Sequence, residues 1–242
     1  MKTIFHKADT RGFANHGWLQ ANHSFSFARW FNQDRMHFGA LRVLNDDIIA
    51  PKMGFGTHPH ENMEIITIPL KGVLKHRDNM GDEWIPVVPG EVQVMSAGTG
   101  VEHSEINGSN NEYLSLFQIW IIPEEQGVSP RYDQKSFSFK DRKNKLQTLV
   151  TSFEDEDSES LKIHQDAKIS RIDLTKGFEF NYKLKSDVYG LYIMNISGEL
   201  EIESNKINNR DAMGFIQTKN VNIKANTDSE LLFIEVPMLE LK

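Results

Sequence analysis

Two short motifs in this sequence carry side chains that could bind a metal ion. The first is His58-Pro59-His60, and the second contains His103 and Glu105 with one residue between them. In a β-strand, residues i and i+2 point to the same face about 6–7 Å apart, so each motif could direct two side chains at one ion. Pro59 has no N–H group and suits the start or the edge of a strand.

Together these motifs would supply three imidazoles and one carboxylate. Such a set binds Fe(II), Ni, Co, Cu, Mn or Zn. Four protein ligands on a six-coordinate ion leave two positions open, and open positions distinguish a reactive centre from a closed structural one. The sequence therefore contains the ligands of a possible reactive metal centre.

Neither spacing is decisive by itself. The nine histidines among 242 residues would give about 0.3 H-x-H triplets by random placement, so the alternative of two ordinary histidines stays open. Histidine–acid pairs with this spacing also include His76/Asp78 and His164/Asp166, for which structural roles are the simpler interpretation. Glu64 is the competing carboxylate, and we interpret it as a neighbour of the ligands or a surface acid.

Short alternating or apolar runs separated by turn residues predict an all-β chain with few, short helices. Leu200 and Ile202 alternate with Glu199, Glu201 and Glu203, which is the two-residue period of a half-buried strand. Many short strands favour a sandwich or barrel. Strands are predicted over residues 40–46, 63–70, 72–78, 91–97, 114–122, 189–197, 198–204, 213–218 and 229–236, with a further core strand over 23–31. The remaining histidines are interpreted as structural or exposed: His6, His16, His23 and His37.

Two β modules of similar outline are expected, because in each a glycine opens a hairpin of matching length and a polar turn precedes a further strand. An acidic stretch without a strand pattern, residues 154–160, lies near the boundary between them. We predict a metal-binding domain over 1–130 and a domain without a metal site over 131–242, with the boundary somewhere in 125–165. The second module contains a single histidine, His164, near its start.

Composition restricts the class of protein. The net charge of −7 argues against a broad basic surface for nucleic acid, and the lack of cysteine excludes disulfides and thiolate metal sites. Neither a secretory signal nor an apolar run of about 20 residues is present. We expect a cytoplasmic protein without a membrane segment, and nothing in the sequence demands more than a monomer.

The order of motifs resembles the pirin family of the cupin superfamily, most closely its bacterial members with quercetin 2,3-dioxygenase activity. The resemblance covers the first module and extends more faintly into the second. It is carried by "ANHGWLQANHSFSFARWF" (14–31), residues 40–81, "PGEVQVMSAGTGVEHSEIN" (89–107) and residues 118–132.

The resemblance implies a bicupin, in which two jelly-roll-like β-barrels lie face to face and only the N-terminal barrel binds metal. The family's ligands fall on His58, His60, His103 and Glu105, and Glu64 is not among them. Residues 61–63 are Glu-Asn-Met, where many pirins have Arg-Gly-Phe. That departure leaves the four ligands unchanged, but the substrate preference of the family cannot be carried over to this chain on the resemblance alone.

The implied function is that of a metal-dependent dioxygenase acting on a flavonol such as quercetin, with ring opening and release of CO. Glu105 would be the catalytic base, and Fe(II) is the favoured ion. Phe55, Met95 and Trp120 are candidate apolar walls of the substrate pocket. The alternative is a redox-sensing regulatory protein that binds protein partners, as the resemblance to eukaryotic pirins implies.

Overall fold

The computed structural model describes residues 1–239, and β-strands dominate them. The only helices in this part of the chain are three short 3₁₀ turns, η1 (Ala8–Thr10), η2 (Gln33–Arg35) and η3 (Phe139–Arg142). None of them is long and apolar enough to cross a membrane. The strands form two seven-stranded and two four-stranded sheets, which confirms the predicted all-β fold.

The N-terminal half pairs one seven-stranded sheet with one four-stranded sheet. The larger has the order β12-β9-β6-β11-β4-β3-β2 and the smaller the order β5-β10-β7-β8. The strands of the larger sheet are β2 (Gly12–Asn15), β3 (Leu19–His23), β4 (Leu41–Ile49), β6 (Glu64–Lys71), β9 (Glu91–Ser96), β11 (Leu114–Ile121) and β12 (Arg131–Ser136). Those of the smaller are β5 (Gly54–His60), β7 (Leu74–Asp78), β8 (Gly81–Val87) and β10 (Val101–Asn107).

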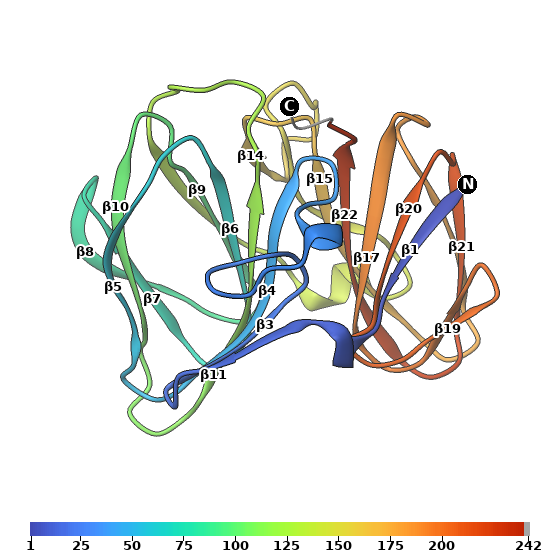
Figure 1. Ribbon diagram of the computed structural model, residues 1–242, viewed down its shortest axis with the longest axis horizontal. Helices are drawn as coiled ribbons and strands as arrows, with labels where there is room; N and C mark the ends of the chain where they lie inside the picture. The colour runs from blue at the N-terminus through green and yellow to red at the C-terminus, as the bar shows by residue number, and fades with distance from the viewer. Residues whose placement is uncertain (240–242) are drawn as a thin grey trace.

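The C-terminal half repeats this arrangement, with the orders β1-β20-β17-β22-β15-β13-β14 and β16-β21-β18-β19. Its larger sheet contains β1 (Lys2–His6), β13 (Gln147–Ser152), β14 (Leu161–Ile163), β15 (Lys168–Leu174), β17 (Tyr189–Ser197), β20 (Ala212–Ile216) and β22 (Ser229–Pro237). Its smaller sheet contains β16 (Glu179–Lys183), β18 (Leu200–Ile202), β19 (Asn205–Ile207) and β21 (Asn220–Ala225). Figure 1 shows the two halves side by side, with the blue N-terminal strand β1 among the orange and red strands of the C-terminal half.

The two seven-stranded sheets share the largest apolar core. Alternation along β11 shows how: Phe117 and Ile119 belong to this shared core, whereas Gln118 and Trp120 line a cavity inside the N-terminal half. A strand buried on both faces has a nearly continuous apolar sequence, and Gln118 is the buried polar residue in this one. Each half is therefore a jelly-roll-like pair of sheets packed against the other, as the bicupin prediction requires.

The interiors of the two halves differ in polarity. One apolar cluster that includes Tyr182, Leu191, Phe215 and Phe233 fills the C-terminal half. The N-terminal interior has only two smaller clusters, one around Leu116 and the other around Ile65 and Met95. The N-terminal half thus has room for a polar site between its sheets.

One predicted strand is wrong. Strand β3 ends at His23, and residues 24–31 form turns with a single bridge between Phe27 and Trp30. Ser26 bends the chain by bonding the backbone of Asn32 through its hydroxyl, and Ala28 has a left-handed φ of 51°. The alternation of aromatic residues over 23–31 therefore does not indicate a strand.

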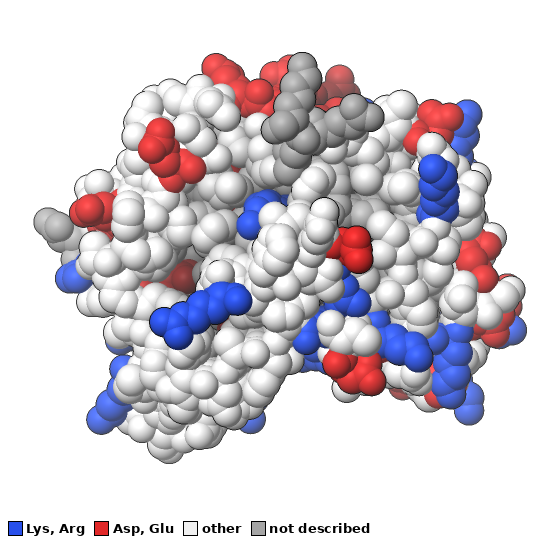
Figure 2. All heavy atoms as spheres, viewed as in Figure 1, with Lys and Arg blue, Asp and Glu red and all other residues white. Residues whose placement is uncertain are grey.

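Sheet membership changes between β12 and β13, within the residues 125–165 predicted for the boundary. Strand β1 nevertheless pairs with β20, so the division into 1–130 and 131–242 stays a prediction. On the face shown in Figure 2, basic and acidic side chains are interspersed among uncharged areas.

Candidate metal centre

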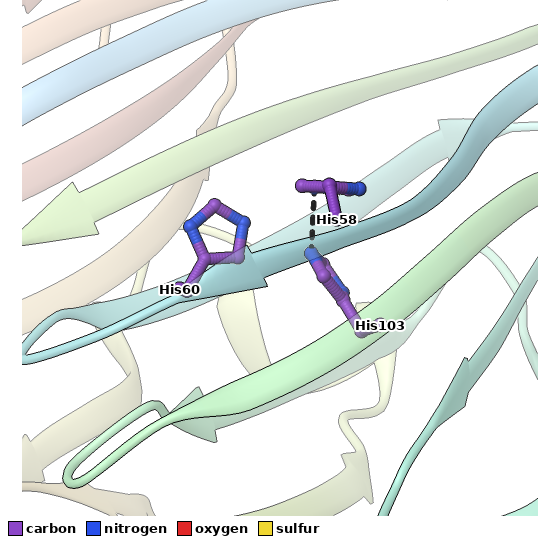
Figure 3. A group of neighbouring side chains, drawn as sticks. All are labelled: His58, His60 and His103. Carbon is purple, nitrogen blue, oxygen red and sulfur yellow. Dashed lines mark hydrogen bonds between the residues drawn. The ribbon is translucent and has the colours of Figure 1, made fainter.

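Strands β5 and β10 bring three of the predicted ligands together. The two strands pair antiparallel with His58 opposite His103, and the Nε2 atoms of these two residues are 3.0 Å apart. The ring centre of His60 lies 4.9 Å from that of His58 and 4.8 Å from that of His103. Figure 3 shows the three rings converging from the two strands. The histidines form one cluster, and their role as ligands is a proposal.

The protonation states of these imidazoles suit metal binding. His58 donates its Nδ1–H to the carbonyl oxygen of Gly56 at 2.8 Å, so its Nε2 carries the lone pair and faces Nε2 of His103. Burial and the neighbouring imidazoles lower the pKa of His60 to about 4 and that of His103 to about 2. Both rings are therefore neutral at neutral pH, as a metal ligand must be.

Glu105 lies beside this cluster and is held by amide groups. Gln118 Nε2 donates to its Oε2 at 2.7 Å and Gln93 Nε2 donates to its Oε1 at 3.2 Å. Burial raises the pKa of Glu105. Glu105, His103 and His76 have ligand atoms within 4.8 Å of one another, and Glu105 lines the same cavity as His58 and His60. The carboxylate is thus in reach of the centre, but it belongs to a second group of ligand atoms that shares only His103.

The amides that hold Glu105 belong to a row of polar side chains across the seven-stranded sheet. The strand register aligns Asn45 with Gln118, Gln118 with Thr67, and Thr67 with Gln93. All four are buried, where apolar residues are usual. Sequence reasoning missed this row, although each of its members is a polar residue within an otherwise mostly apolar run.

His76 is the other residue near the centre that sequence reasoning missed. It is fully buried, pairs with Glu105 in the register of β7 and β10, and stacks on the Tyr132 ring at 4.7 Å between centres. Its Nε2 lies 2.9 Å from Asp78 Oδ2, and the other carboxylate oxygen of Asp78 accepts a hydrogen bond from the backbone N–H of Met80 in the turn. The His76 ring is also only 5.3 Å from that of His103. His76 and Asp78 therefore lie next to the proposed ligands His103 and Glu105, and their role is not confined to a surface turn.

The donor set fits a first-row divalent ion. Two neighbouring nitrogen ligands at about 2.1 Å from an octahedral ion lie about 3.0 Å apart, and the Nε2 atoms of His58 and His103 have this separation. The Nδ1 atom of His103 is buried without a hydrogen-bond partner among the described residues. With no thiolate available, imidazole and carboxylate donors suit Fe, Ni, Co, Cu, Mn or Zn alike.

A cavity of about 220 Å³ lies against the centre. Its walls include His58, His60 and Glu105 on one side, with Phe55 and Trp120 as aromatic neighbours. Two of the three candidate apolar walls, Phe55 and Trp120, thus line this cavity. The prediction is wrong for Met95, because Met95 is fully buried in an apolar cluster with Ile65 and Val101 instead.

Glu64 faces away from the centre. It is buried, accepts a hydrogen bond from Ser96 Oγ at 2.7 Å, and lies 3.2 Å from Nδ1 of His164 in the C-terminal half. It is therefore neither a ligand nor a surface acid, but part of the interface between the two halves. Two other buried histidines have structural partners, as expected: His6 bonds Tyr192 and His23 bonds Asn45.

Comparison with known proteins identifies the family. Residues 5–121 match the pirin family model, and residues 149–236 match the model of the quercetinase C-terminal cupin domain. A quercetin 2,3-dioxygenase of Escherichia coli K12 is 43% identical over 232 residues, which cover 96% of this chain and 97% of that protein. The chain belongs to the pirin family.

Other relatives of this pirin agree with that assignment. A pirin-like protein of Caulobacter vibrioides is 41% identical over 94% of this chain and 96% of that protein. The crystal structure of YhhW from Escherichia coli has a TM-score of 0.93 and 40% identity, with all of both chains covered. A second structure of that bacterial pirin, with a TM-score of 0.92 and 39% identity over 98% of this chain and 100% of that chain, is a complex with nickel(II).

Substituting Gln118 tests whether the polar row supports the centre. In Gln118→Leu, Glu105 loses the 2.7 Å hydrogen bond that orients its Oε2, so the carboxylate should coordinate an ion less well. We expect nickel affinity to fall about 10–100-fold, as for other groups that orient a metal ligand. Titration with nickel against Gln20→Leu, an exposed position on β3, measures the effect. An unchanged affinity would show that the row does not position Glu105.

Proposed function

We propose that this pirin is a metal-dependent dioxygenase that opens the central ring of a flavonol such as quercetin. One flavonol and one O₂ give one depside, an ester of two phenolic acids, and one CO, so the products contain all atoms of the reactants. The observation that carries the proposal is a cluster of three imidazoles beside a buried carboxylate, with His58, His60 and Glu105 on the wall of one aromatic-lined cavity. The relative named quercetin 2,3-dioxygenase supports it.

His58, His60, His103 and Glu105 would hold one divalent transition-metal ion, for which we favour Fe(II). When bound, the ion supplies Lewis acidity to the 3-hydroxyl and 4-carbonyl groups of the flavonol. Glu105 accepts the proton of the 3-hydroxyl at a carboxylate oxygen and returns it to the product, because the overall reaction neither consumes nor releases protons. Its raised pKa makes this carboxylate a stronger base than an exposed one.

The cavity must extend beyond the centre to hold such a substrate. Its volume of about 220 Å³ is below the range of about 300–1,000 Å³ typical of ligand pockets. A second cavity of about 600 Å³, lined by residues 13–30 and Phe55, shares Phe27 and Phe55 with the first. In our proposal the flavonol lies across both cavities. Its 3-hydroxyl and 4-carbonyl groups, which form its chelating edge, lie at the metal centre, and its rings lie against Phe27, Phe55 and Trp120.

Aerobic turnover tests the function directly. Protein loaded separately with Fe(II) or Ni(II) is expected to consume quercetin and O₂ and to release CO in equal amounts, whereas protein treated with a chelator is expected to be inactive. Quercetin absorbance, an oxygen electrode and CO trapping give the three quantities. Quercetin loss without CO would contradict ring opening, and no loss with any of the proposed metals would contradict the function altogether.

A further inference from the structure

A buried carboxyl group in the inner cavity has no role in the chemistry described above. Asp47 lies on β4, is 3% exposed, and lines the cavity that His58, His60 and Glu105 also line. Its Oδ1 atom is buried and has no hydrogen-bond partner among the described residues. Leaving a polar group buried and unpartnered costs free energy, so this carboxyl destabilises the free protein.

The neighbours of Asp47 explain why no partner reaches it. Across the strand ladders, Asp47 pairs with Leu116 on β11 and with Ala21 on β3, and both of these residues belong to an apolar cluster. Asp46, the preceding residue, points to the other face of the sheet and pairs with Arg11 and Arg210. Asp46 therefore has structural partners of the usual kind, whereas Oδ1 of Asp47 has none among the described residues, although Asn45 and Gln118 line the same cavity.

The carboxyl of Asp47 can act as a hydrogen-bond donor. Burial and the nearby carboxylates of Asp46 and Glu105 raise its pKa to about 8. At neutral pH it is mostly protonated, and a neutral carboxyl has one O–H donor in addition to its acceptor positions. A phenolic hydroxyl, which both donates and accepts, is its chemical complement.

We propose that Asp47 is a specificity-determining residue that hydrogen-bonds a hydroxyl group of the flavonol close to the chelating edge. This inference rests on the proposed function and adds to it the selection of substrate by hydroxyl pattern. Because Asp47 lines the inner cavity with His58 and His60, the candidate hydroxyls are the 5-hydroxyl, which is next to the 4-carbonyl, and those of the 2-phenyl ring, which is attached next to the carbon of the 3-hydroxyl. An enzyme site that bonds a substrate hydroxyl discriminates against analogues lacking it.

Anaerobic binding to the nickel-loaded protein tests the proposal without turnover. Galangin, kaempferol and quercetin carry none, one and two hydroxyls on the 2-phenyl ring, and fisetin lacks the 5-hydroxyl of quercetin. In Asp47→Leu, we expect affinity to fall about 10-fold for flavonols with the contacted hydroxyl and to stay unchanged for the analogue without it. Asp47→Asn, which keeps a neutral donor and acceptor, is expected to bind within about threefold of the wild type.

A stability measurement separates recognition from a structural role. Because Asp47→Leu removes an unpartnered polar group, its midpoint of thermal unfolding is expected to rise by about 2–4 °C. Asp173→Asn, which weakens the ion pair with Arg142 in the C-terminal half, is the control and is expected to lower the midpoint while leaving flavonol selectivity unchanged. Unchanged affinity ratios in Asp47→Leu would overturn the inference alone, whereas failure of the wild type to bind any of the four flavonols would overturn the proposed function.

Discussion

A His103→Ala variant is expected to lose at least about 100-fold in nickel affinity, more than the loss expected from an orienting group such as Gln118. His103 is central because its Nε2 lies 3.0 Å from that of His58 and because it belongs to both groups of ligand atoms, the one with His60 and the one with Glu105. Without His103, no residue belongs to both groups, so Glu105 and the imidazoles of His58 and His60 no longer form one connected set of ligand atoms. Metal content after dialysis and a nickel titration measure the loss.

Thermal unfolding gives a second readout of the same substitution. An ion at about 100 times its dissociation constant stabilises the folded state by about 2.7 kcal/mol, or roughly 5–10 °C for a chain of this length. The wild type should show this nickel-dependent rise and His103→Ala should not. His164→Ala, a histidine at the interface between the two halves, should retain the rise. A full nickel response in His103→Ala would contradict the proposed centre.

Replacing Glu105 by glutamine is expected to lower kcat for quercetin by about 10²–10⁴-fold, the contribution of a positioned general base. The amide has nearly the same shape as the carboxylate but cannot accept the 3-hydroxyl proton. Because three histidines remain, the variant should still bind nickel, although more weakly than the wild type. Turnover must therefore be measured at nickel concentrations that saturate the variant, with bound metal determined in the same samples.

Glu102 supplies the matched control for this substitution. It lies on the same strand, β10, but is exposed and opposite Pro59 on the edge strand. Glu102→Gln changes the net charge equally and should leave kcat within about twofold, as surface substitutions generally have small effects. Equal kcat in Glu105→Gln and the wild type, at equal metal content, would remove Glu105 from the catalytic role and leave the metal centre untouched.

Local patterns in the sequence were sufficient to predict the fold class and most central strands. Strands such as β11 and β17 have mostly apolar runs of eight or nine residues, which are typical of buried strands when turn residues flank them. The placement of His58 and His60 on one face of a strand was also predictable from their two-residue spacing, whereas their meeting with His103 was implied only by the family resemblance. The sequence pattern of residues 23–31 was misleading, because a hydroxyl-to-backbone bond at Ser26 turns the chain where alternation predicted a strand.

The surroundings of the centre could not be predicted, since they depend on the register between distant strands. Gln93 and Gln118 reach Glu105 only because β9, β6 and β11 align their polar residues in one row. His76 comes to lie opposite Glu105 through the pairing of β7 with β10. Nothing within either strand specifies which residue of its neighbour it will face, so a single polar residue in an apolar run is the only local signal.

The position of strand β1 has a consequence for the order in which the chain folds during synthesis. It precedes every other described strand in the sequence, yet it pairs with β20, and His6 bonds Tyr192 across 186 residues of sequence. Strand β1 must therefore wait, unpaired, until β20 has been produced. Contacts this distant in sequence slow folding, and β20 remains an open sheet edge until they form. The beginning of the chain thus completes the last part of the fold, and expressing the two halves separately would leave that edge uncovered.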